Sequence, residues 1–317
     1  MVKQRIVATV PLGEPAVTIL GRIATLEVSP APDEETMMTM LEDTIAIVCR
    51  GEGGASRKLI EAAASLKVIG RCGAGYDSVD VDCATERGIP LVIAPVGAFA
   101  VAEGALAMLL SLVKLLPMGD HAVRSGNWEW RYSHLSGDMA EKTLGLIGLG
   151  RIGSHFAKLV QPFGMTVLAF DPYASVAGIE QVELDELLAR SDYISLHTPL
   201  NNETRGLINA ERIAKMKPGA ILINTSRGGV IERLDILADA LDSGQLAAVG
   251  LDVFPTEPPD ISHRIFDNPR CLCSPHLVGG SELAMYRIFE SMAVDMTAVI
   301  KGERPRFCVN PEVFDGS

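Results

Sequence analysis

The stretch Thr143-Leu-Gly-Leu-Ile-Gly-Leu-Gly-Arg-Ile-Gly153 restricts the possible fold more than any other part of this chain. Its first half is an apolar run typical of a buried parallel strand, and apolar residues recur at helical spacing after it. Between them, Gly148-x-Gly150-x-x-Gly153 predicts a sharp strand-to-helix turn. The first glycine permits the turn, the second lets the backbone approach a pyrophosphate, and the third lets helix pack against strand. Unpaired N–H groups at the helix N-terminus favour the negative charge of such phosphates.

A carboxylate follows at the distance that this glycine pattern requires. A second apolar segment, 165–170, ends at Asp171, about 20 residues on, where an acid is expected to bind ribose hydroxyls. Strand, turn, helix, strand and acid therefore predict a dinucleotide site. The alternative is a tight strand–helix turn in another α/β protein, with Asp171 as a turn residue before Pro172. A carboxylate here repels a 2′-phosphate, so the sequence favours NAD over NADP.

Alternating strands and helices are expected on both sides of this unit. Before it, we expect strands at 4–10, 44–49, 66–69 and 90–93, with helices at 56–64 and 81–87. After it, we expect strands at 191–199, 218–224, 248–253 and 271–274, with helices at 182–188 and 230–244. This rhythm predicts an α/β protein with two doubly wound parallel sheets, Rossmann-like or flavodoxin-like.

A length of 317 residues suits two domains. A long apolar helix at about 101–116, ending at Pro117, would connect the first α/β unit to the glycine turn and offers a dimer surface. A long amphipathic helix at 282–301 is expected to return to the first domain. The predicted division is a discontinuous substrate-binding domain of residues 1–100 plus 283–317 and an NAD-binding Rossmann domain of residues 101–282.

Composition and charge exclude several classes of partner. Twenty-eight basic and 40 acidic residues give a net charge of −12, which argues against nucleic acid. We see no signal-peptide core at the N-terminus, and the most apolar helix is short and carries Lys114, so no membrane partner is expected. The six cysteines form no C-x-x-C pair. Free, mostly buried thiols in a reducing cytoplasm are expected, and no metal site.

Chemically useful side chains follow three strands of the second sheet, in Asn224-Thr-Ser-Arg227-Gly, in the segment from Leu251 to Glu257-Pro258, and in Ser274-Pro-His276. Arg227 would grip a substrate carboxylate with two hydrogen bonds and polarise a forming carbonyl. His276 would accept a hydroxyl proton as hydride leaves for the cofactor. Glu257 would orient the imidazole and stabilise its charged form. The set suits oxidation of an alcohol beside a carboxylate.

Each of these residues also has an ordinary structural interpretation. Arg227 could pair with a nearby carboxylate, Glu257 could cap a turn, and His276 could be a hydrogen-bonded loop histidine. Their occurrence at three strand ends of one nucleotide-binding domain favours catalysis. His197, at a fourth strand end, suits a structural or cofactor-adjacent role better than acid/base chemistry.

Over nearly its whole length the chain resembles the D-isomer-specific 2-hydroxyacid dehydrogenases. The glycine turn with Phe170-Asp-Pro172 resembles the family's nucleotide signature. The segment from Ser191 to Pro199 resembles its second signature, with Tyr193 where a smaller apolar residue is usual. Asn224-Thr-Ser-Arg227-Gly resembles the third, with Ile231-Glu232 where Val-Asp is common. The match is closest to the phosphoglycerate-dehydrogenase-like branch, but without the C-terminal regulatory domain, so allosteric control by serine is not expected.

The resemblance implies roles for particular residues. The family's catalytic arginine, glutamate and histidine correspond to Arg227, Glu257 and His276. The implied cofactor contacts are Gly148, Gly150, Arg151, Ile152, Gly153, Asp171, Thr198, Thr225, Ser226, Arg227, Asp252, His276 and Gly279. The tentative substrate contacts are Arg50, Arg71, Ala74, Gly75 and Arg227. Homodimers through the long helix near residue 101 are also implied.

Together, these expectations predict an NAD-dependent oxidoreductase that acts on a D-2-hydroxy acid and its 2-keto acid. The substrate class stays open between 3-phosphoglycerate, glycerate or hydroxypyruvate, and glyoxylate. Arg50 and Arg71 could bind a substrate phosphate, or they could be solvated or paired. A formate-dehydrogenase mechanism is disfavoured because both Glu257 and His276 are present. The alternative function is an NAD(H)-sensing binding protein that resembles the C-terminal-binding corepressors, against which the absence of long disordered tails argues.

Overall fold

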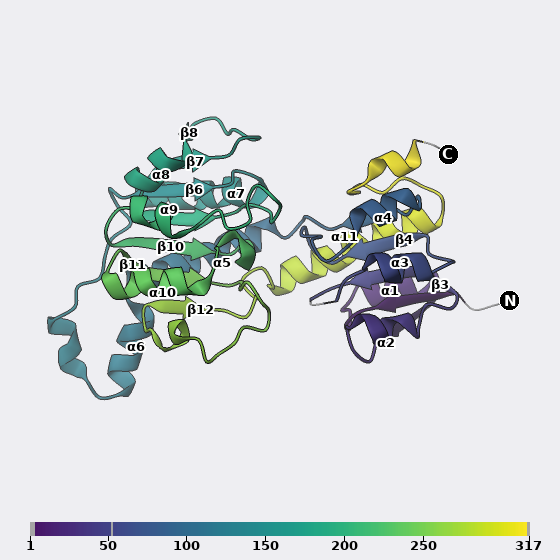
Figure 1. Cartoon of the computed structure of the whole chain (residues 1–317), viewed down its shortest axis with the longest axis horizontal. Coiled ribbons are helices and arrows are strands. Elements are labelled where there is room, and N and C mark those ends of the chain that lie inside the picture. Colours follow the sequence, from purple (N-terminus) through teal and green to yellow (C-terminus); the bar gives the residue numbers. More distant parts are fainter. Residues whose placement is uncertain (1–3, 52, 316–317) are drawn as a thin grey trace. The chain divides into compact units, whose positions relative to one another are not determined.

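The computed structural model describes residues 4–51 and 53–315. They divide into two compact units, which we describe separately (Figure 1). Unit 1 contains the described residues up to Gly97 together with those from Ser281 onward, and unit 2 is Ala98–Gly280. Unit 1 is therefore assembled from two distant parts of the chain, drawn in purple to blue and in yellow.

Unit 1 is built on a five-stranded sheet in the order β2-β1-β3-β4-β5, with every strand pair parallel. This is the flavodoxin-like order. The strands are β1 (Arg5–Ala8), β2 (Thr25–Val28), β3 (Thr44–Cys49), β4 (Val68–Arg71) and β5 (Leu91–Ile93). The helices between them are α1 (Ala16–Gly21), α2 (Glu34–Met38), α3 (Arg57–Ala62) and α4 (Val81–Glu86). Only β3, in the middle of the sheet, is buried along its whole length.

Helix α11 (Glu282–Ile300) completes the core of unit 1 by packing against α1 and β4. Its buried face, including Met292 and Met296, joins one of the two apolar clusters of the sheet. Gly70 on β4 permits this close packing, because a Cβ there would lie 2.2 Å from Sδ of Met296. The 3-10 helix η5 (Pro311–Phe314) follows.

Unit 2 is built on a seven-stranded parallel sheet in the order β12-β11-β10-β9-β6-β7-β8. The strands are β6 (Thr143–Ile147), β7 (Thr166–Phe170), β8 (Glu180–Gln181), β9 (Tyr193–Leu196), β10 (Ala220–Asn224), β11 (Leu246–Leu251) and β12 (Cys271–Cys273). The chain order reverses between β6 and β9, which is the switch point where ligands bind in open α/β sheets. The predicted fold class, two doubly wound parallel sheets, is confirmed.

The helices of unit 2 cover both faces of this sheet. They are α5 (Ala98–Val113), α6 (Leu116–Arg124), α7 (Arg151–Val160), α8 (Leu184–Arg190), α9 (Ala210–Lys215) and α10 (Leu234–Ser243). Short 3-10 helices are η1 (Trp128–Tyr132), η2 (Gln161–Phe163), η3 (Gly228–Val230) and η4 (Arg264–Asp267). Helix α5 packs against α7, β10 and β11, and forms part of the core on that face.

The prediction of one apolar helix at 101–116 that ends at Pro117 is wrong. Helix α5 ends at Val113, and Leu115 adopts a left-handed conformation with φ 55°. Pro117 lies in the first turn of α6. A backbone N–H there would have no acceptor within the helix, so the N–H that proline lacks costs no helical hydrogen bond. Among the described residues no single helix has the length and apolar character to cross a membrane, whereas α5 and α6, bent by 57°, meet both conditions only as a pair.

Candidate active site

The three glycines after β6 meet three different steric conditions. Gly148 has φ +98°, and a Cβ there would lie 2.7 Å from the carbonyl carbon of His197. A Cβ on Gly153 would lie 2.1 Å from the carbonyl oxygen of Gly148, so this glycine lets α7 pack against the turn. Around Gly150, by contrast, a Cβ would meet nothing within 4 Å. The backbone at the N-terminus of α7 is therefore open to a ligand.

Asp171 is fixed beside this turn by backbone donors from two loops. Its Oδ2 accepts the N–H of Leu149 at 2.6 Å, within the glycine turn. Its Oδ1 accepts the N–H groups of Tyr173 and Ala174 at 2.9 and 3.0 Å. The carboxylate thus ties the loop after β7 to the start of α7. Gly150, the residue immediately before α7, has no side chain to cap the helix, so the positive end of the helix dipole remains available to a ligand there.

Two threonine hydroxyls in the same unit point to a missing polar partner. Thr198 follows β9 and Thr225 follows β10, and the Oγ1 atom of each is buried without a hydrogen-bond partner among the described residues. Leaving a buried hydroxyl unpaired costs about 1–3 kcal/mol. Ser226 differs, because its Oγ donates to Oδ1 of Asn224 at 2.9 Å. The two threonines therefore fit the edge of a polar ligand that binds at these strand ends.

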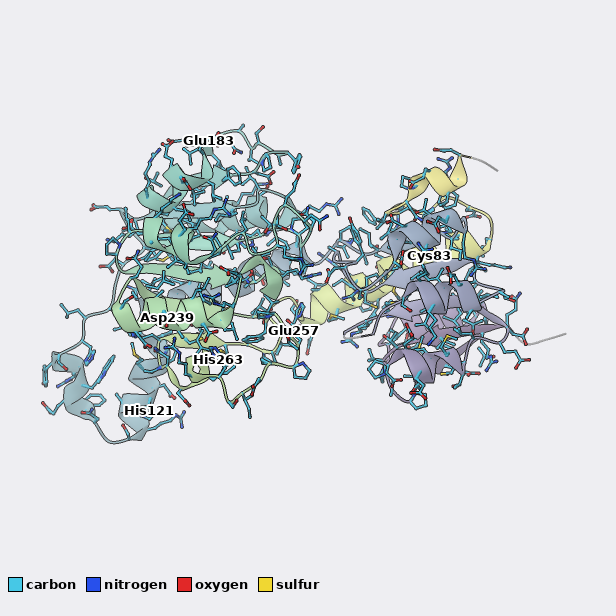
Figure 2. The ribbon with its side chains drawn as sticks, viewed as in Figure 1. Cys83, His121, Glu183, Asp239, Glu257 and His263 are labelled. Atoms are coloured by element: carbon cyan, nitrogen blue, oxygen red, sulfur yellow. The ribbon has the colours of Figure 1, made fainter. Side chains whose placement is uncertain are left out.

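Glu257 and His276 form a hydrogen-bonded pair between the loops after β11 and β12 (Figure 2 labels Glu257). Nδ1 of His276 lies 2.8 Å from Oε2 of Glu257, and Oε1 accepts the N–H of Phe254 at 3.0 Å. Burial opposes ionisation of Glu257, but the His276 hydrogen bond, the Phe254 N–H and the charge of Arg227 outweigh it. Together they hold the pKa of this carboxyl below its ordinary value of 4.5. The side chain of His276 is 50% exposed and that of Glu257 is 33% exposed, so a substrate can reach the pair.

Arg227 lies on the loop after β10, which is pressed against the loop after β11. A Cβ on Gly228 would lie 1.9 Å from the carbonyl carbon of Phe254, so only glycine permits this contact. Nη1 of Arg227 donates to the carbonyl of Ser226 at 2.8 Å. The backbone carbonyl of Arg227 accepts a hydrogen bond from Nδ2 of Asn224 at 2.9 Å. The cation is thereby held near enough to Glu257 to lower its pKa.

Two positioning residues were not given these roles by the sequence. Buried Asn224 binds both Arg227 and Ser226 through its side chain. Buried Asp252 accepts the N–H groups of Leu277 and Val278 at 2.8 and 3.3 Å and so fixes the loop that carries His276. Burial raises the pKa of Asp252, although these backbone donors oppose the rise. The sequence placed Asp252 only among the cofactor contacts; the signal for its structural role was its place at the end of a buried strand.

His197 lies beside the glycine turn in an environment unsuited to acid/base chemistry. Its Nε2 is 3.0 Å from Oγ of Ser195, and its Nδ1 is buried without a partner among the described residues. Its ring meets the edge of Phe156, with the two ring centroids 5.4 Å apart. Burial lowers the pKa of His197 to about 3, so the ring stays neutral near physiological pH. This favours the structural or cofactor-adjacent role.

The expected substrate residues of unit 1 lie at the carboxyl ends of the strands β3 and β4. Nη1 of Arg50 donates to the carbonyl of Pro11 at 2.9 Å, and its guanidinium lies 5.2 Å from the ring centre of Phe289. Nη1 of Arg71 donates to the carbonyl of Cys72 at 2.7 Å. Gly73, with φ +113°, turns the chain into the loop of Ala74 and Gly75. Backbone carbonyls thus help to hold both guanidinium groups near the carboxyl ends of these two strands.

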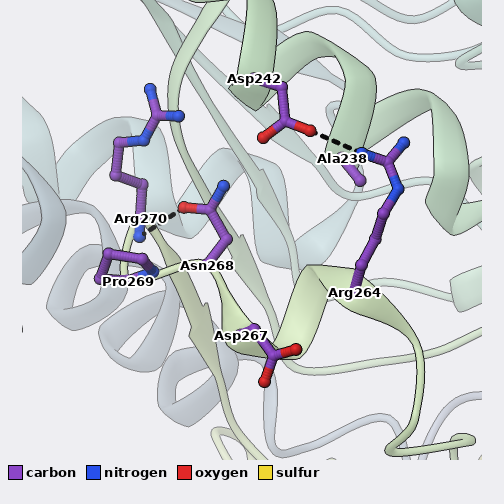
Figure 3. A pocket seen from close by; sticks show the side chains of 7 residues that line it. All are labelled: Ala238, Asp242, Arg264, Asp267, Asn268, Pro269 and Arg270. Carbon is purple, nitrogen blue, oxygen red and sulfur yellow. Dashed lines mark hydrogen bonds and ion pairs between the residues drawn. The ribbon is translucent and has the colours of Figure 1, made fainter.

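A separate hollow in unit 2 lies between α10, η4 and the segment that leads into β12 (Figure 3). It is lined by Ala238, Asp242, Arg264, Asp267, Asn268, Pro269 and Arg270. Arg264 pairs with Asp239 and Asp242, so its charge is already balanced. Arg270 immediately precedes β12, whereas His276 follows that strand. The hollow is therefore not the candidate active site. The described residues also contain no group of three or more His, Cys, Asp or Glu placed to hold a metal ion.

Comparison with known proteins gives consistent results. The family model for the NAD binding domain of D-isomer specific 2-hydroxyacid dehydrogenases matches residues 106–278. A D-3-phosphoglycerate dehydrogenase from Synechocystis sp. is 37% identical over 300 residues, which are 93% of this chain and 54% of that protein. The chain spans about half the length of the curated relatives it matches.

Two solved structures illustrate the similarity over the whole chain. A glyoxylate reductase from Paecilomyes thermophila has a TM-score of 0.88 and 31% identity, and the match covers 98% of this chain and 99% of that one. A D-lactate dehydrogenase from Aquifex aeolicus, complexed with NAD and lactic acid, has a TM-score of 0.87 and 30% identity, with 99% and 98% covered.

Proposed function

The chain belongs to the D-isomer-specific 2-hydroxyacid dehydrogenase family, in its phosphoglycerate-dehydrogenase-like branch, and from this premise we propose that it interconverts a D-2-hydroxy acid and its 2-keto acid with NAD. The observation that carries this proposal is the contact between His276 and Glu257 beside the Arg227 loop. A histidine, its orienting carboxylate and a cation stand together at strand ends of the nucleotide-binding unit. That is the set required to move a proton while a hydride is transferred.

NAD would be held at the glycine turn and the adjoining strand ends. The open backbone at Gly150 suits a pyrophosphate, and the unpaired Oγ1 atoms of Thr198 and Thr225 suit polar ligand groups. The fixed carboxylate of Asp171 favours ribose hydroxyls over a 2′-phosphate, which supports NAD over NADP. The remaining residues proposed as contacts are Gly148, Arg151, Ile152, Gly153, Ser226, Arg227, Asp252, His276 and Gly279. NAD held by these residues would supply the hydride acceptor, and NADH the hydride donor.

The protein's own groups handle the proton and the charge. Because Nδ1 of His276 faces the ionised Glu257, its proton stays on Nδ1 and Nε2 is left to accept the substrate hydroxyl proton. Glu257 then stabilises the positive ring. Arg227 binds the substrate carboxylate and polarises the carbonyl oxygen. In the reverse direction His276 returns the proton from Nε2.

We propose unit 1 as the substrate-binding domain and unit 2 as the NAD-binding domain. Substrate contacts would come from Arg50, Arg71, Ala74 and Gly75, together with Arg227. The candidate substrates are 3-phosphoglycerate, glycerate with hydroxypyruvate, and glyoxylate. Arg50, which follows β3, and Arg71, the last residue of β4, supply the charge that a phosphate needs, and hydrogen bonds to backbone carbonyls hold them in place.

We further propose that the protein is a homodimer formed through α5 and the segment that follows it. From Leu116 onward this segment exposes large apolar side chains: Leu116, Val123, Trp128, Tyr132 and Leu135, the last 92% exposed. Clustered exposed apolar residues mark protein–protein contacts. A reducing compartment such as the cytoplasm suits the six free thiols.

A screen of NADH and NADPH oxidation against 2-keto acids, phosphorylated and not, tests the function. We expect turnover of about 1 per second or more with at least one keto acid, and a preference for NADH. Tight NADH binding without turnover of any compound in the panel would support the alternative, an NAD(H)-sensing binding protein resembling the C-terminal-binding corepressors. Comparing phosphohydroxypyruvate with hydroxypyruvate then shows whether the protein recognises a phosphate, the role proposed for Arg50 and Arg71.

A further inference from the structure

Two thiols lie side by side on the last strand of the unit 2 sheet. Cys271 and Cys273 are two residues apart on β12 and so project to the same face, and their Sγ atoms are 3.6 Å apart. Leu272 between them packs into the opposite apolar cluster. Cys273 is exposed, so reagents in solution can reach the pair. The function proposed above uses neither thiol.

This thiol pair is joined directly to the catalytic loop. Ser274 follows Cys273 in the chain and donates its N–H to the carbonyl of Leu251 at 2.9 Å. The N–H of His276 donates to the carbonyl of Asp252 at 2.8 Å. These bonds continue the β11–β12 pairing to the backbone of His276. Strand β12 is an edge strand with β11 as its neighbour, so less backbone pairing opposes its movement than in the middle of the sheet.

We propose that Cys271 and Cys273 are a redox modification site: hydroperoxides convert them to a reversible intramolecular disulfide that moves His276 away from its working position. The effect on turnover rests on the function proposed above, whereas formation of the bridge does not. The same site would be reset by a dithiol reductant.

The chemistry balances with a hydroperoxide as the oxidant. The sulfur of Cys273 attacks one peroxide oxygen, the O–O bond breaks, and an alcohol leaves while Cys273 becomes a sulfenic acid. The sulfur of Cys271 then attacks that sulfur, forming the S–S bond and releasing water. The two thiols thus lose two protons and two electrons in total, and the peroxide is reduced to an alcohol and water. The hydrogen bond between the two thiols lowers the pKa of Cys273 and raises that of Cys271. Cys273 is also the more exposed of the two, which makes it the attacking thiolate.

Closing the bridge requires a local change in the strand. The sulfur atoms must approach from 3.6 Å to about 2.05 Å. Residues two apart in an extended strand have Cα atoms about 6.6 Å apart, close to the upper limit of about 6.8 Å for a disulfide. The usual separation is about 5.5–6 Å, so we expect bridge formation to shorten the strand at Leu272 and to draw the chain after Cys273 with it. Exposed and strained bridges of this kind are the readily reduced, regulatory ones.

The test is to treat the reduced full-length protein with hydrogen peroxide, alkylate remaining thiols, and map the modified cysteines by mass spectrometry. We expect the peptide with Cys271 and Cys273 to lose two hydrogens and to resist alkylation until a dithiol is added. Hydrogen exchange in the segment 274–278 should increase in parallel. Keto-acid turnover should fall by about 10- to 100-fold, since a misplacement of about 1 Å costs about that much.

Matched variants separate the possible outcomes. Cys273→Ser should keep the reduced enzyme's activity and become resistant to peroxide, and Cys271→Ala should fail to form the bridge. Cys308→Ser, a partly buried thiol of unit 1, should respond like the unmodified protein. If Cys271 and Cys273 stay alkylatable after peroxide, or if they join without changing exchange at 274–278, the proposal is wrong. Lack of turnover in the reduced protein would instead count against the proposed function alone.

Discussion

Two histidines of unit 2 make similar contacts with very different expected consequences. Nδ1 of His276 is 2.8 Å from Glu257, and Nε2 of His263 is 3.2 Å from Asp235. His263 also accepts the N–H of Ile265 at the start of η4, so both of its ring nitrogens have structural partners. His276 uses one nitrogen for Glu257, and the proposed mechanism leaves the other for a substrate. A histidine–carboxylate pair is therefore not by itself a catalytic feature.

We predict that His276→Asn lowers kcat by about 10²- to 10⁴-fold, the usual contribution of acid/base catalysis. NADH should still bind, because the glycine turn and Asp171, to which most of the cofactor is assigned, are unaltered. Steady-state kinetics and a fluorescence titration with NADH measure the two effects. His263→Asn is the matched control and should leave kcat unchanged; equal losses in both variants would remove His276 from the acid/base role.

The pH dependence of stability should contain a contribution from His197. Its folded pKa of about 3 lies below the ordinary value of 6.5. As the pH falls below 6.5, the unfolded chain takes up a proton that the folded protein does not, so stability is lost towards pH 3. The expected slope is up to about 1.4 kcal/mol per pH unit.

His197→Asn removes this titration, so the variant should lose stability less steeply on acidification. Urea unfolding of both proteins between pH 6.5 and about pH 4 provides the comparison. Parallel curves for the two proteins would mean that His197 titrates equally in the folded and unfolded states.

At the scale of elements, the sequence predicts most of what periodicity and motifs encode. The glycine turn, the strand ends with Arg227 and His276, and the fold class were all accessible from it. Strand β2 was missed because it lies at the edge of its sheet, where none of its residues is fully buried. It therefore has no continuous apolar run. The break between α5 and α6 was missed because apolar composition continues through it, and nothing local predicts a left-handed Leu115. Contacts between distant loops, such as Gly228 against Phe254, depend on tertiary packing.

The strand–turn–helix element allows two glycines with opposite constraints to be compared. In Gly153→Ala the new Cβ collides with the Gly148 carbonyl, so we predict a loss of stability of about 1–3 kcal/mol together with weaker NADH binding. In Gly150→Ala the Cβ meets no protein atom, so the melting temperature should change little while the KM for NADH rises. Thermal unfolding and steady-state kinetics of both variants test this. Unchanged NADH binding in Gly150→Ala would argue that no phosphate approaches the turn.

For the whole molecule, the exposed apolar residues after α5 predict association of two copies. Val123→Asp places a charge on a side chain that is 60% exposed, so it should weaken the dimer without disturbing a core. Light scattering during size-exclusion chromatography should show a dimer for the unmodified protein and a shift towards monomer for the variant. Val17→Asp, at an exposed position on α1 of unit 1, is the matched control. A monomeric unmodified protein would contradict the prediction.

The packing of α11 on β4 also has a consequence during synthesis. The ribosome completes the strands of unit 1 well before it makes α11, because the whole of unit 2 is translated in between. At about 5–20 residues per second this delay is about 10–40 seconds. Throughout it, the sheet face that includes Ile6, Val48 and Val68 lacks the helix that buries it. Either chaperones must shield this face in the nascent chain, or unit 2 must fold before unit 1 is completed.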